Sequence, residues 1–218
     1  MNRDFEFTQL LRAYRAGIIS ERAFEAEMAA LESGNGKNSG ARGFRAMGTT
    51  YSSERDAVAA MLDRFRAGEA NGEAAFRGWL KHCTTECIRS GLRMIAEREG
   101  YHARVFESRM RDLGVECKAA VTEPSRKITE YLSDPNHSDK QNLLYLSSLA
   151  PDPEAFFKPV REFSETLKDD LESKELFNLY IQDELSSARW LLNVCAVLNT
   201  PAEAASFQAS AGSAASLV

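Results

Sequence analysis

Four glutamates and one histidine are spaced along this sequence as the ligands of a metal ion could be. Glu69 lies thirty residues before Glu99, and Glu154 lies thirty residues before Glu184. The segment Glu99-Gly-Tyr-His102 places a carboxylate and an imidazole on one face of a helix, because residues three apart share a face. Carboxylate and imidazole ligands together suit iron or manganese. We therefore predict a site for one or two iron or manganese ions at Glu69, Glu99, His102, Glu154 and Glu184.

The two halves of the sequence also show a weak internal repeat. A shift of 85 residues aligns residues 91–106, GLRMIAEREGYHARVF, with residues 176–191, LFNLYIQDELSSARWL, and places Glu99 on Glu184. The apolar positions broadly agree along the aligned helices. Two related helix pairs each have an apolar face that one pair cannot bury alone, so together they favour one four-helix bundle.

Composition divides the chain into four parts. Residues 1–32 alternate charged and apolar groups at helical spacing and predict a short helical hairpin. Residues 33–52 are rich in Gly and Ser and predict a flexible linker. Residues 53–200 form the body, and residues 201–218 form a small, polar tail that we expect to be disordered. No convincing strand pattern is evident anywhere.

Capping and helix-breaking residues indicate where the helices of the body begin and end. Ser53 can cap the first helix, and Gly114 can end the second. Residues 115–137 are less regular, because Pro124 and Pro135 act as breakers. The remaining boundaries are a break at Thr84–Thr85, a helix start at Ser138, an interruption at Pro151–Pro153 and a last helix over 169–199. The predicted fold class is all-α, an antiparallel four-helix bundle preceded by a short helical hairpin.

Residues 54–111, with Glu69 and the Glu99-x-x-His102 spacing, resemble the first helix pair of a rubrerythrin-type ferritin-like protein. The resemblance covers about 145 residues when residues 138–199 are included. It implies a ferritin-like bundle with two metal ions that react with dioxygen or peroxide. In one branch of the family that chemistry includes tRNA hydroxylation.

The second half departs from that family pattern at two positions. Ser187 stands where the second histidine is expected, and a serine hydroxyl is a poor iron ligand. Asp152-Pro153 is typical of an N-cap and first helical residue, which puts Glu154 in a first turn rather than in the middle of a helix. Tyr101 and Tyr180 could lie near a metal centre, although core packing explains both of them better.

Two functions therefore remain open, and whether the chain is an enzyme stays undecided. The departures favour a ferritin-like scaffold or interaction protein with a lost or partial metal site. The retained Glu99-x-x-His102 favours a di-iron or di-manganese carboxylate oxidoreductase that activates dioxygen or peroxide. A buried, unpaired carboxylate is costly, so burial of these acids would favour metal binding.

The N-terminal string LLRAYRAGIISERAFEAEMAAL resembles the short SHOCT-type module over about twenty-five residues. That resemblance implies a helical hairpin used for association, and an amphipathic hairpin packed on the body is the alternative. We expect a protein partner, or self-association, through this hairpin.

Charge and hydropathy argue against other classes of partner. The net charge is −5 without a basic run, so neither nucleic acid nor a membrane surface is expected as a partner. No stretch approaches the roughly 18 apolar residues of a membrane span, and the N-terminal segment does not have the pattern of a secretory signal. The four cysteines are scattered, so we expect reduced thiols in a cytoplasmic protein.

Overall fold

The computed structural model describes Leu11, Tyr14, Phe24, Glu25, Met28 and residues 43–200. The chain separates into two units, which divide after Gly43 and are described separately. In the first unit, the rings of Tyr14 and Phe24 stack with their centroids 4.7 Å apart. The rest of the predicted hairpin over 1–32, and the predicted tail over 201–218, lie outside the described residues, so both remain predictions.

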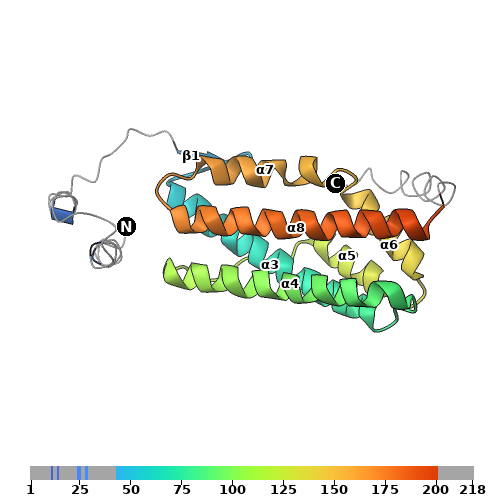
Figure 1. The fold of residues 1–218 in the computed structure, drawn as a ribbon. Helices are drawn as coiled ribbons and strands as arrows, with labels where there is room; N and C mark the ends of the chain where they lie inside the picture. The colour runs from blue at the N-terminus through green and yellow to red at the C-terminus, as the bar shows by residue number, and fades with distance from the viewer. Residues whose placement is uncertain (1–10, 12–13, 15–23, 26–27, 29–42, 201–218) are drawn as a thin grey trace. The chain divides into compact units, whose positions relative to one another are not determined.

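The second unit is mostly α-helical, which confirms the prediction of a mainly α-helical protein (Figure 1). Its described helices are α3 (Glu54–Leu80), α4 (Glu86–Asp112), α5 (Glu123–Ser133), α6 (Asp139–Leu149), α7 (Pro153–Thr166) and α8 (Leu171–Leu198). Among the described residues, no helix combines the length and the apolar character needed to span a bilayer.

The helix ends follow the capping signals of the sequence. Ser53 accepts a hydrogen bond from the backbone N–H of Asp56 at the start of α3. Ser138 and Gln141 form a reciprocal capping box at the start of α6. Gly114 follows α4 with a φ of 65°, a left-handed conformation that glycine adopts without steric cost. Local capping therefore sets the lengths of the helices that position the candidate site.

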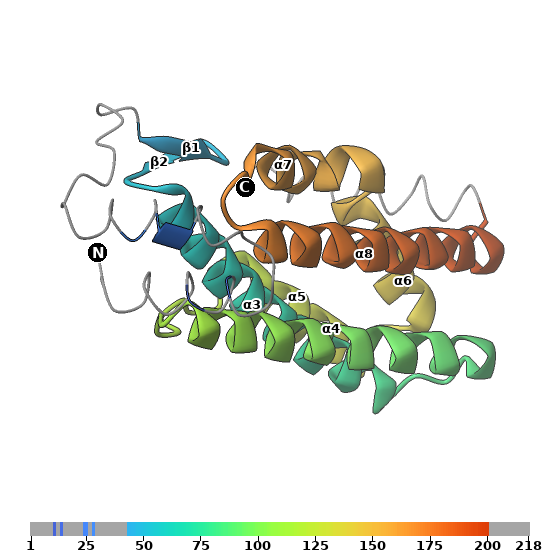
Figure 2. The ribbon, with the colours of Figure 1, turned by 60° about the vertical axis from the view of Figure 1, so that its left-hand side comes forward.

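The helices form two antiparallel pairs that lie side by side (Figures 1 and 2). Helices α3 and α4 are joined by a short turn, and α7 and α8 by another. Between the pairs, α5 packs on α3 and returns the chain from the end of α4 towards the opposite end of the pair (Figure 2). Helix α6 packs on α8 at that end, ahead of the break before α7.

The only strands among the described residues lie in the segment assigned to the linker, so the prediction of no strand is wrong here. Strand β1 (Phe44–Ala46) pairs antiparallel with β2 (Thr49–Tyr51). Both turn residues between them, Met47 and Gly48, have positive φ, as a two-residue hairpin turn requires. The Phe44 ring packs edge-on against Phe163 of α7, which gives the hairpin an apolar anchor. The part of the linker before Gly43 lies outside the described residues.

Helix α5 is a second correction, because residues 115–137 were expected to be irregular. Pro124 lies in the first turn of α5, where its missing N–H would have had no partner in the helix. Thr122 caps that turn by accepting a hydrogen bond from the N–H of Ser125. The proline therefore begins a helix here instead of breaking one.

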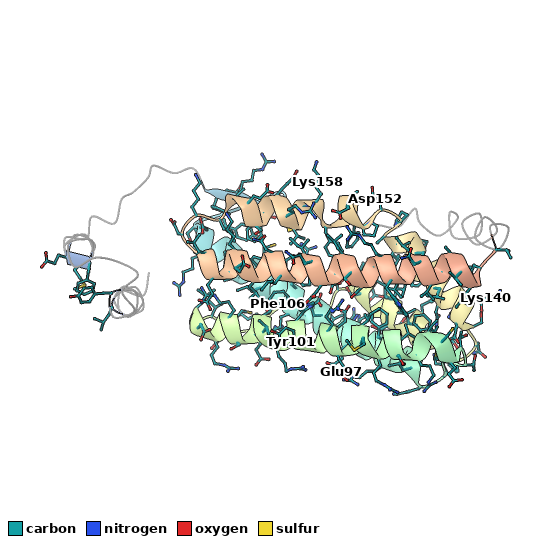
Figure 3. All side chains as sticks on the ribbon, viewed as in Figure 1. Glu97, Tyr101, Phe106, Lys140, Asp152 and Lys158 are labelled. Atoms are coloured by element: carbon teal, nitrogen blue, oxygen red, sulfur yellow. The ribbon has the colours of Figure 1, made fainter. Side chains whose placement is uncertain are left out.

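Apolar and aromatic side chains fill the space between the helices in two groups. One group surrounds the fully buried Trp79 and Leu92 near the α3–α4 turn. The other is aromatic and includes Phe106 and Phe177, whose centroids lie 6.2 Å apart. Phe106 points between the helices, whereas Lys158 lies on the outer surface (Figure 3). The candidate site lies in the core between these two groups.

The carboxylate of Asp139 connects α6 to the α3–α4 turn. It accepts hydrogen bonds from Trp79 Nε1 at 2.6 Å and from the backbone N–H groups of Thr84 and Thr85 at 3.0 and 2.7 Å. Burial alone would raise the pKa of Asp139, but the hydrogen bonds from Thr85, Trp79 and Thr84 outweigh it and lower the pKa to about 2. Ionised Asp139 therefore stabilises the contact between α6 and the α3–α4 turn.

We predict that Asp139→Asn lowers the free energy of unfolding by about 2 kcal/mol at pH 7. The pKa of Asp139 is lower in the folded protein than its ordinary 3.8, so its contribution is present above that pH and is lost as the pH falls towards 2. Urea titrations at several pH values should show the gap between wild type and variant closing below about pH 4. Asp152→Asn is the control, since asparagine caps helices as well as aspartate does. A gap of equal size at pH 7 and pH 3 would contradict this assignment.

Candidate metal centre

Three helices contribute acidic or imidazole side chains to one point in the middle of the core. Glu69 comes from α3, Glu99 and His102 from α4, and Glu184 from α8. Glu69, Glu99 and His102 are only 6%, 8% and 4% exposed. The Glu184 side chain is 13% exposed. The structure thus brings together four of the five residues singled out in the sequence.

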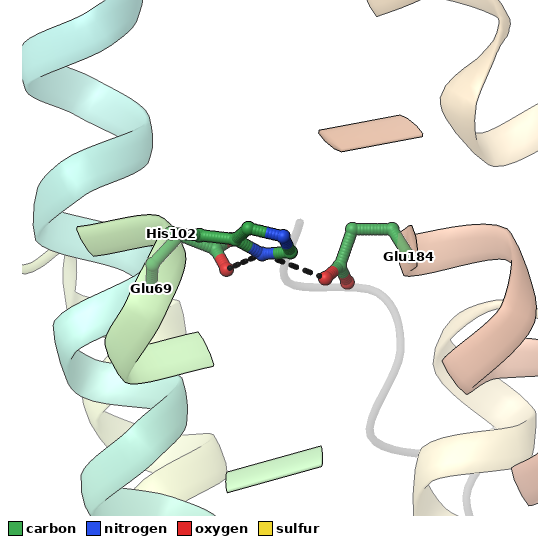
Figure 4. Close-up of side chains that lie close together, drawn as sticks. All are labelled: Glu69, His102 and Glu184. Carbon is green, nitrogen blue, oxygen red and sulfur yellow. Dashed lines mark hydrogen bonds and ion pairs between the residues drawn. The ribbon is translucent and has the colours of Figure 1, made fainter. Parts of the chain in front are cut away.

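His102 lies between two carboxylates, with one ring nitrogen facing both (Figure 4). Nδ1 of His102 is 3.2 Å from Glu69 Oε2 and 3.4 Å from Glu184 Oε1. A neutral or protonated imidazole has at most one proton on Nδ1, so it can donate a full hydrogen bond to only one of them. Glu184 Oε1 has no hydrogen-bond partner among the described residues. The site therefore has more acceptor oxygens than donors.

Two further side chains hold Glu69 and His102 in place. The Tyr180 hydroxyl donates a hydrogen bond to Glu69 Oε1 at 2.9 Å. Nε2 of His102 lies 3.2 Å from Asp183 Oδ2. Asp183 was not singled out in the sequence, and Tyr180 was assigned to core packing. The only signal for Tyr180 is its position one turn before Glu184 on the same helix face.

Glycine at position 72 makes room for the Glu99 carboxylate. Gly72 lies on α3 about one turn after Glu69, facing α4. A Cβ atom added at Gly72 would collide with Glu99 Oε2. The absence of a side chain at this position thus lets a carboxylate from α4 lie directly against the backbone of α3.

Burial and mutual repulsion raise the pKa values of the carboxyl groups. Burial is the main cause for Glu69, and the charge of Glu184 adds to it. Contacts with His102 offset part of this effect, which leaves the pKa of Glu69 at about 7. Burial also raises the pKa of Glu99 well above its ordinary value, with further contributions from Glu69 and Glu184. In the protein without a cation, these acids hold protons that exposed glutamates would lose.

The basic and phenolic groups respond to the same negative environment. Burial alone would lower the pKa of His102, but its contacts with Glu184 and Glu69 outweigh burial and raise the pKa to about 10. Burial, followed by the charges of Glu69 and Glu184, raises the pKa of Tyr180 well above its ordinary value. The site therefore favours positive charge strongly.

The donor set has the composition and spacing of a cation site. One atom each from Glu69, His102 and Glu184 lies within 4.8 Å of the other two. Ligand atoms that bind one ion at right angles with bonds of about 2.1 Å are about 3 Å apart, close to the two separations at Nδ1. The unpartnered Oε1 of Glu184 would gain a partner in such an ion. These residues therefore fit a divalent iron or manganese ion.

The structure does not bring Glu154 to this cluster. Asp152 caps α7 and Pro153 begins it, which places Glu154 in the exposed first turn. There its carboxylate pairs with Arg161 at 2.9 Å and also contacts Arg189. Its hydrogen bond with Arg161 is the main cause of its lowered pKa. Tyr101, the other tyrosine considered near a metal centre, is 56% exposed.

Arg98 is hydrogen-bonded to Ser187, which stands where a second histidine was expected. Ser187 lies one turn after Asp183 on α8 and is buried. Nη1 of Arg98 donates hydrogen bonds to Ser187 Oγ at 2.8 Å and to the Asp183 carbonyl oxygen at 2.9 Å. The Arg98 guanidinium group therefore occupies the hydroxyl oxygen of Ser187 and supplies a permanent positive charge beside the cluster.

Comparisons of the chain with protein-family models, with curated proteins and with solved structures find no match.

We predict that Glu99→Gln stabilises the metal-free protein at pH 8. An acid with a raised pKa in the folded state must take up a proton on folding, so it destabilises the fold increasingly as the pH rises above its ordinary 4.5. Glutamine carries no charge at any pH. Calorimetry in the presence of a chelator should show a higher melting temperature for the variant at pH 8 and a smaller difference at pH 5.

Glu97→Gln is the matched control for this variant. Glu97 is on the same helix, but its side chain is 57% exposed and pairs with Arg77 at the surface. Loss of an exposed pair should change the free energy of unfolding by less than about 1 kcal/mol. If Glu99→Gln melted below wild type at pH 8, the assignment of Glu99 as an unfavourably buried acid would be wrong.

Proposed function

We propose that this chain is a ferritin-like four-helix bundle that binds one iron or manganese ion through Glu69, His102 and Glu184. The burial of three carboxylates around one imidazole is the observation that supports this most. A buried carboxylate that is neither paired nor bound to a cation is strongly unfavourable. A divalent cation would remove that cost at Glu69 and Glu184 together.

The order of the helices supports the ferritin-like part of the proposal. Helices α3 and α4 form one antiparallel pair, and α7 and α8 form the other (Figure 1). The chain crosses between the pairs by way of α5, and ferritin-like bundles have one long crossover of this kind. Helices α6 and α7 together take the place of one long helix, interrupted near Pro151–Pro153.

One ion fits the described residues better than two. Ferritin-like centres with two metals take a histidine from each half, and Ser187 occupies the second of these positions. The guanidinium of Arg98 is bonded to that serine, and a fixed positive charge next to the first ion disfavours a second. Glu154, the other expected ligand of the second half, pairs with arginines at the surface.

Each residue of the cluster then has a defined part. Glu69, His102 and Glu184 hold the ion, and Tyr180 and Asp183 orient Glu69 and His102 through hydrogen bonds. A bound iron or manganese ion would supply redox chemistry towards dioxygen or peroxide. The aromatic side chains beside the cluster, with Phe106 fully buried, exclude water from one side of the site.

A metal-free scaffold is the second candidate function, and one observation favours it. Arg98 lies against the cluster and can offset part of its negative charge without a metal ion. In that case function would depend on association, for which the N-terminal hairpin, as a SHOCT-type module, is the candidate segment. Metal content separates the two functions directly.

We predict about one iron or manganese ion per chain in protein purified from cells supplemented with either metal. The double variant Glu99→Ala/His102→Ala should contain less than about a tenth of that amount, because both an imidazole ligand and an adjacent carboxylate are removed. Elemental analysis gives the stoichiometry. Glu154→Ala is the control, because Glu154 is an acid of the same kind on the exposed first turn of α7 and should leave the metal content unchanged.

The outcomes discriminate between the candidates. Two ions per chain, both lost in the double variant, would overturn the single-ion proposal in favour of a two-metal centre. No metal in wild type, together with unchanged helicity and melting temperature in the double variant, would favour the scaffold.

A further inference from the structure

An apolar pocket adjoins the candidate metal centre on the side of α6 and α7. Its volume is about 160 Å³, and its walls include Phe76, Ile95, Leu146, Phe157 and Leu191. Glu99 and Glu184 line the same pocket, so these two residues separate it from His102 and Glu69. A molecule in the pocket would therefore lie directly beside the cluster.

The pocket opens where the chain breaks between α6 and α7. Leu149 and Phe156 lie on either side of this break and also line the pocket. They are 42% and 56% exposed, which is unusual for side chains of their size. The entrance to the pocket is therefore apolar and suits an uncharged molecule.

The wall of the pocket contains a buried hydroxyl group. Ser147 Oγ is buried and has no hydrogen-bond partner among the described residues. A buried hydroxyl without a partner is unfavourable, and a ligand with one hydrogen-bonding group would supply that partner. The apolar walls disfavour a charged ligand, because burying a charge without a partner is costly.

We propose that this pocket is the substrate site of the metal centre and accepts a small, uncharged, mainly apolar molecule with one hydroxyl group. The volume supports this size, since an engineered apolar cavity of about 150 Å³ in another protein binds benzene. The ligand would contact the apolar walls, donate or accept a hydrogen bond at Ser147 and lie against Glu99 and Glu184. The role as a substrate site depends on the proposed metal-binding function, but binding to the pocket does not.

The test measures binding of p-cresol and toluene to the full-length, metal-free protein by ligand-observed NMR and calorimetry. The two probes differ by one hydroxyl group. We expect saturable binding of both, with p-cresol tighter than toluene. Ser147→Ala should weaken p-cresol about fivefold and leave toluene unchanged, as expected for one hydrogen bond. Ala188→Phe, which fills the pocket from α8, should weaken both probes at least tenfold.

Ala196→Phe is the control, because Ala196 is an exposed position on the same helix and should leave both affinities unchanged. Circular dichroism tests whether Ala188→Phe is folded. If this variant does not fold, Ser147→Ala alone tests the proposal, through its different effects on the affinities for p-cresol and toluene. The proposed ligand site would be overturned if wild type showed no saturable binding, or if folded Ala188→Phe bound the probes as tightly as wild type. Metal content is measured on each preparation before the metal is removed for the binding test, so failure of the metal site and failure of the pocket remain distinguishable.

Discussion

Three carboxylates buried around a single imidazole are the feature on which the rest of this structure depends. Glu69, Glu99 and Glu184 come from three helices, so the helices have to align closely enough to bring them together. Gly72 permits that approach by leaving space for Glu99. Tyr180 and Asp183 satisfy part of the hydrogen bonding, yet Glu184 Oε1 has no hydrogen-bond partner among the described residues. A cation in this position would explain why these residues lie together, which core packing alone does not.

The break between α6 and α7 accounts for two properties at once. Pro153 starts a new helix there, which places Glu154 in an exposed first turn and removes it from the cluster. The same break leaves an apolar opening that leads to Glu99 and Glu184. The two halves also differ because Arg98 donates a hydrogen bond to Ser187, at the position where the second half would carry its histidine. Under our proposal, the helices hold one metal position, and the apolar pocket lies beside it.

The sequence predicted most of the helix ends because caps such as Ser53 and the Ser138 capping box are local signals. Helix α5 was missed because Pro124 was interpreted as a breaker, whereas it lies in a first turn. The spacing of Glu69, Glu99, His102 and Glu184 also predicted which side chains meet. Tyr180 and Asp183 were not predicted as part of the site. A tyrosine fits an apolar core, and an acid beside Glu184 is typical of a charged surface. Glu154 joined the predicted ligands through its spacing to Glu184, although Asp152-Pro153 already indicated the first-turn position that the structure gives it. The β hairpin was missed because Met47-Gly48 is not a common turn pair.

Anomalous diffraction from crystals of the protein soaked in manganese would locate the proposed ion. We expect one anomalous peak per chain in the core, about 2.1 Å from Glu69, His102 and Glu184. A core without a peak, or peaks confined to exposed acids such as Glu154, would contradict it.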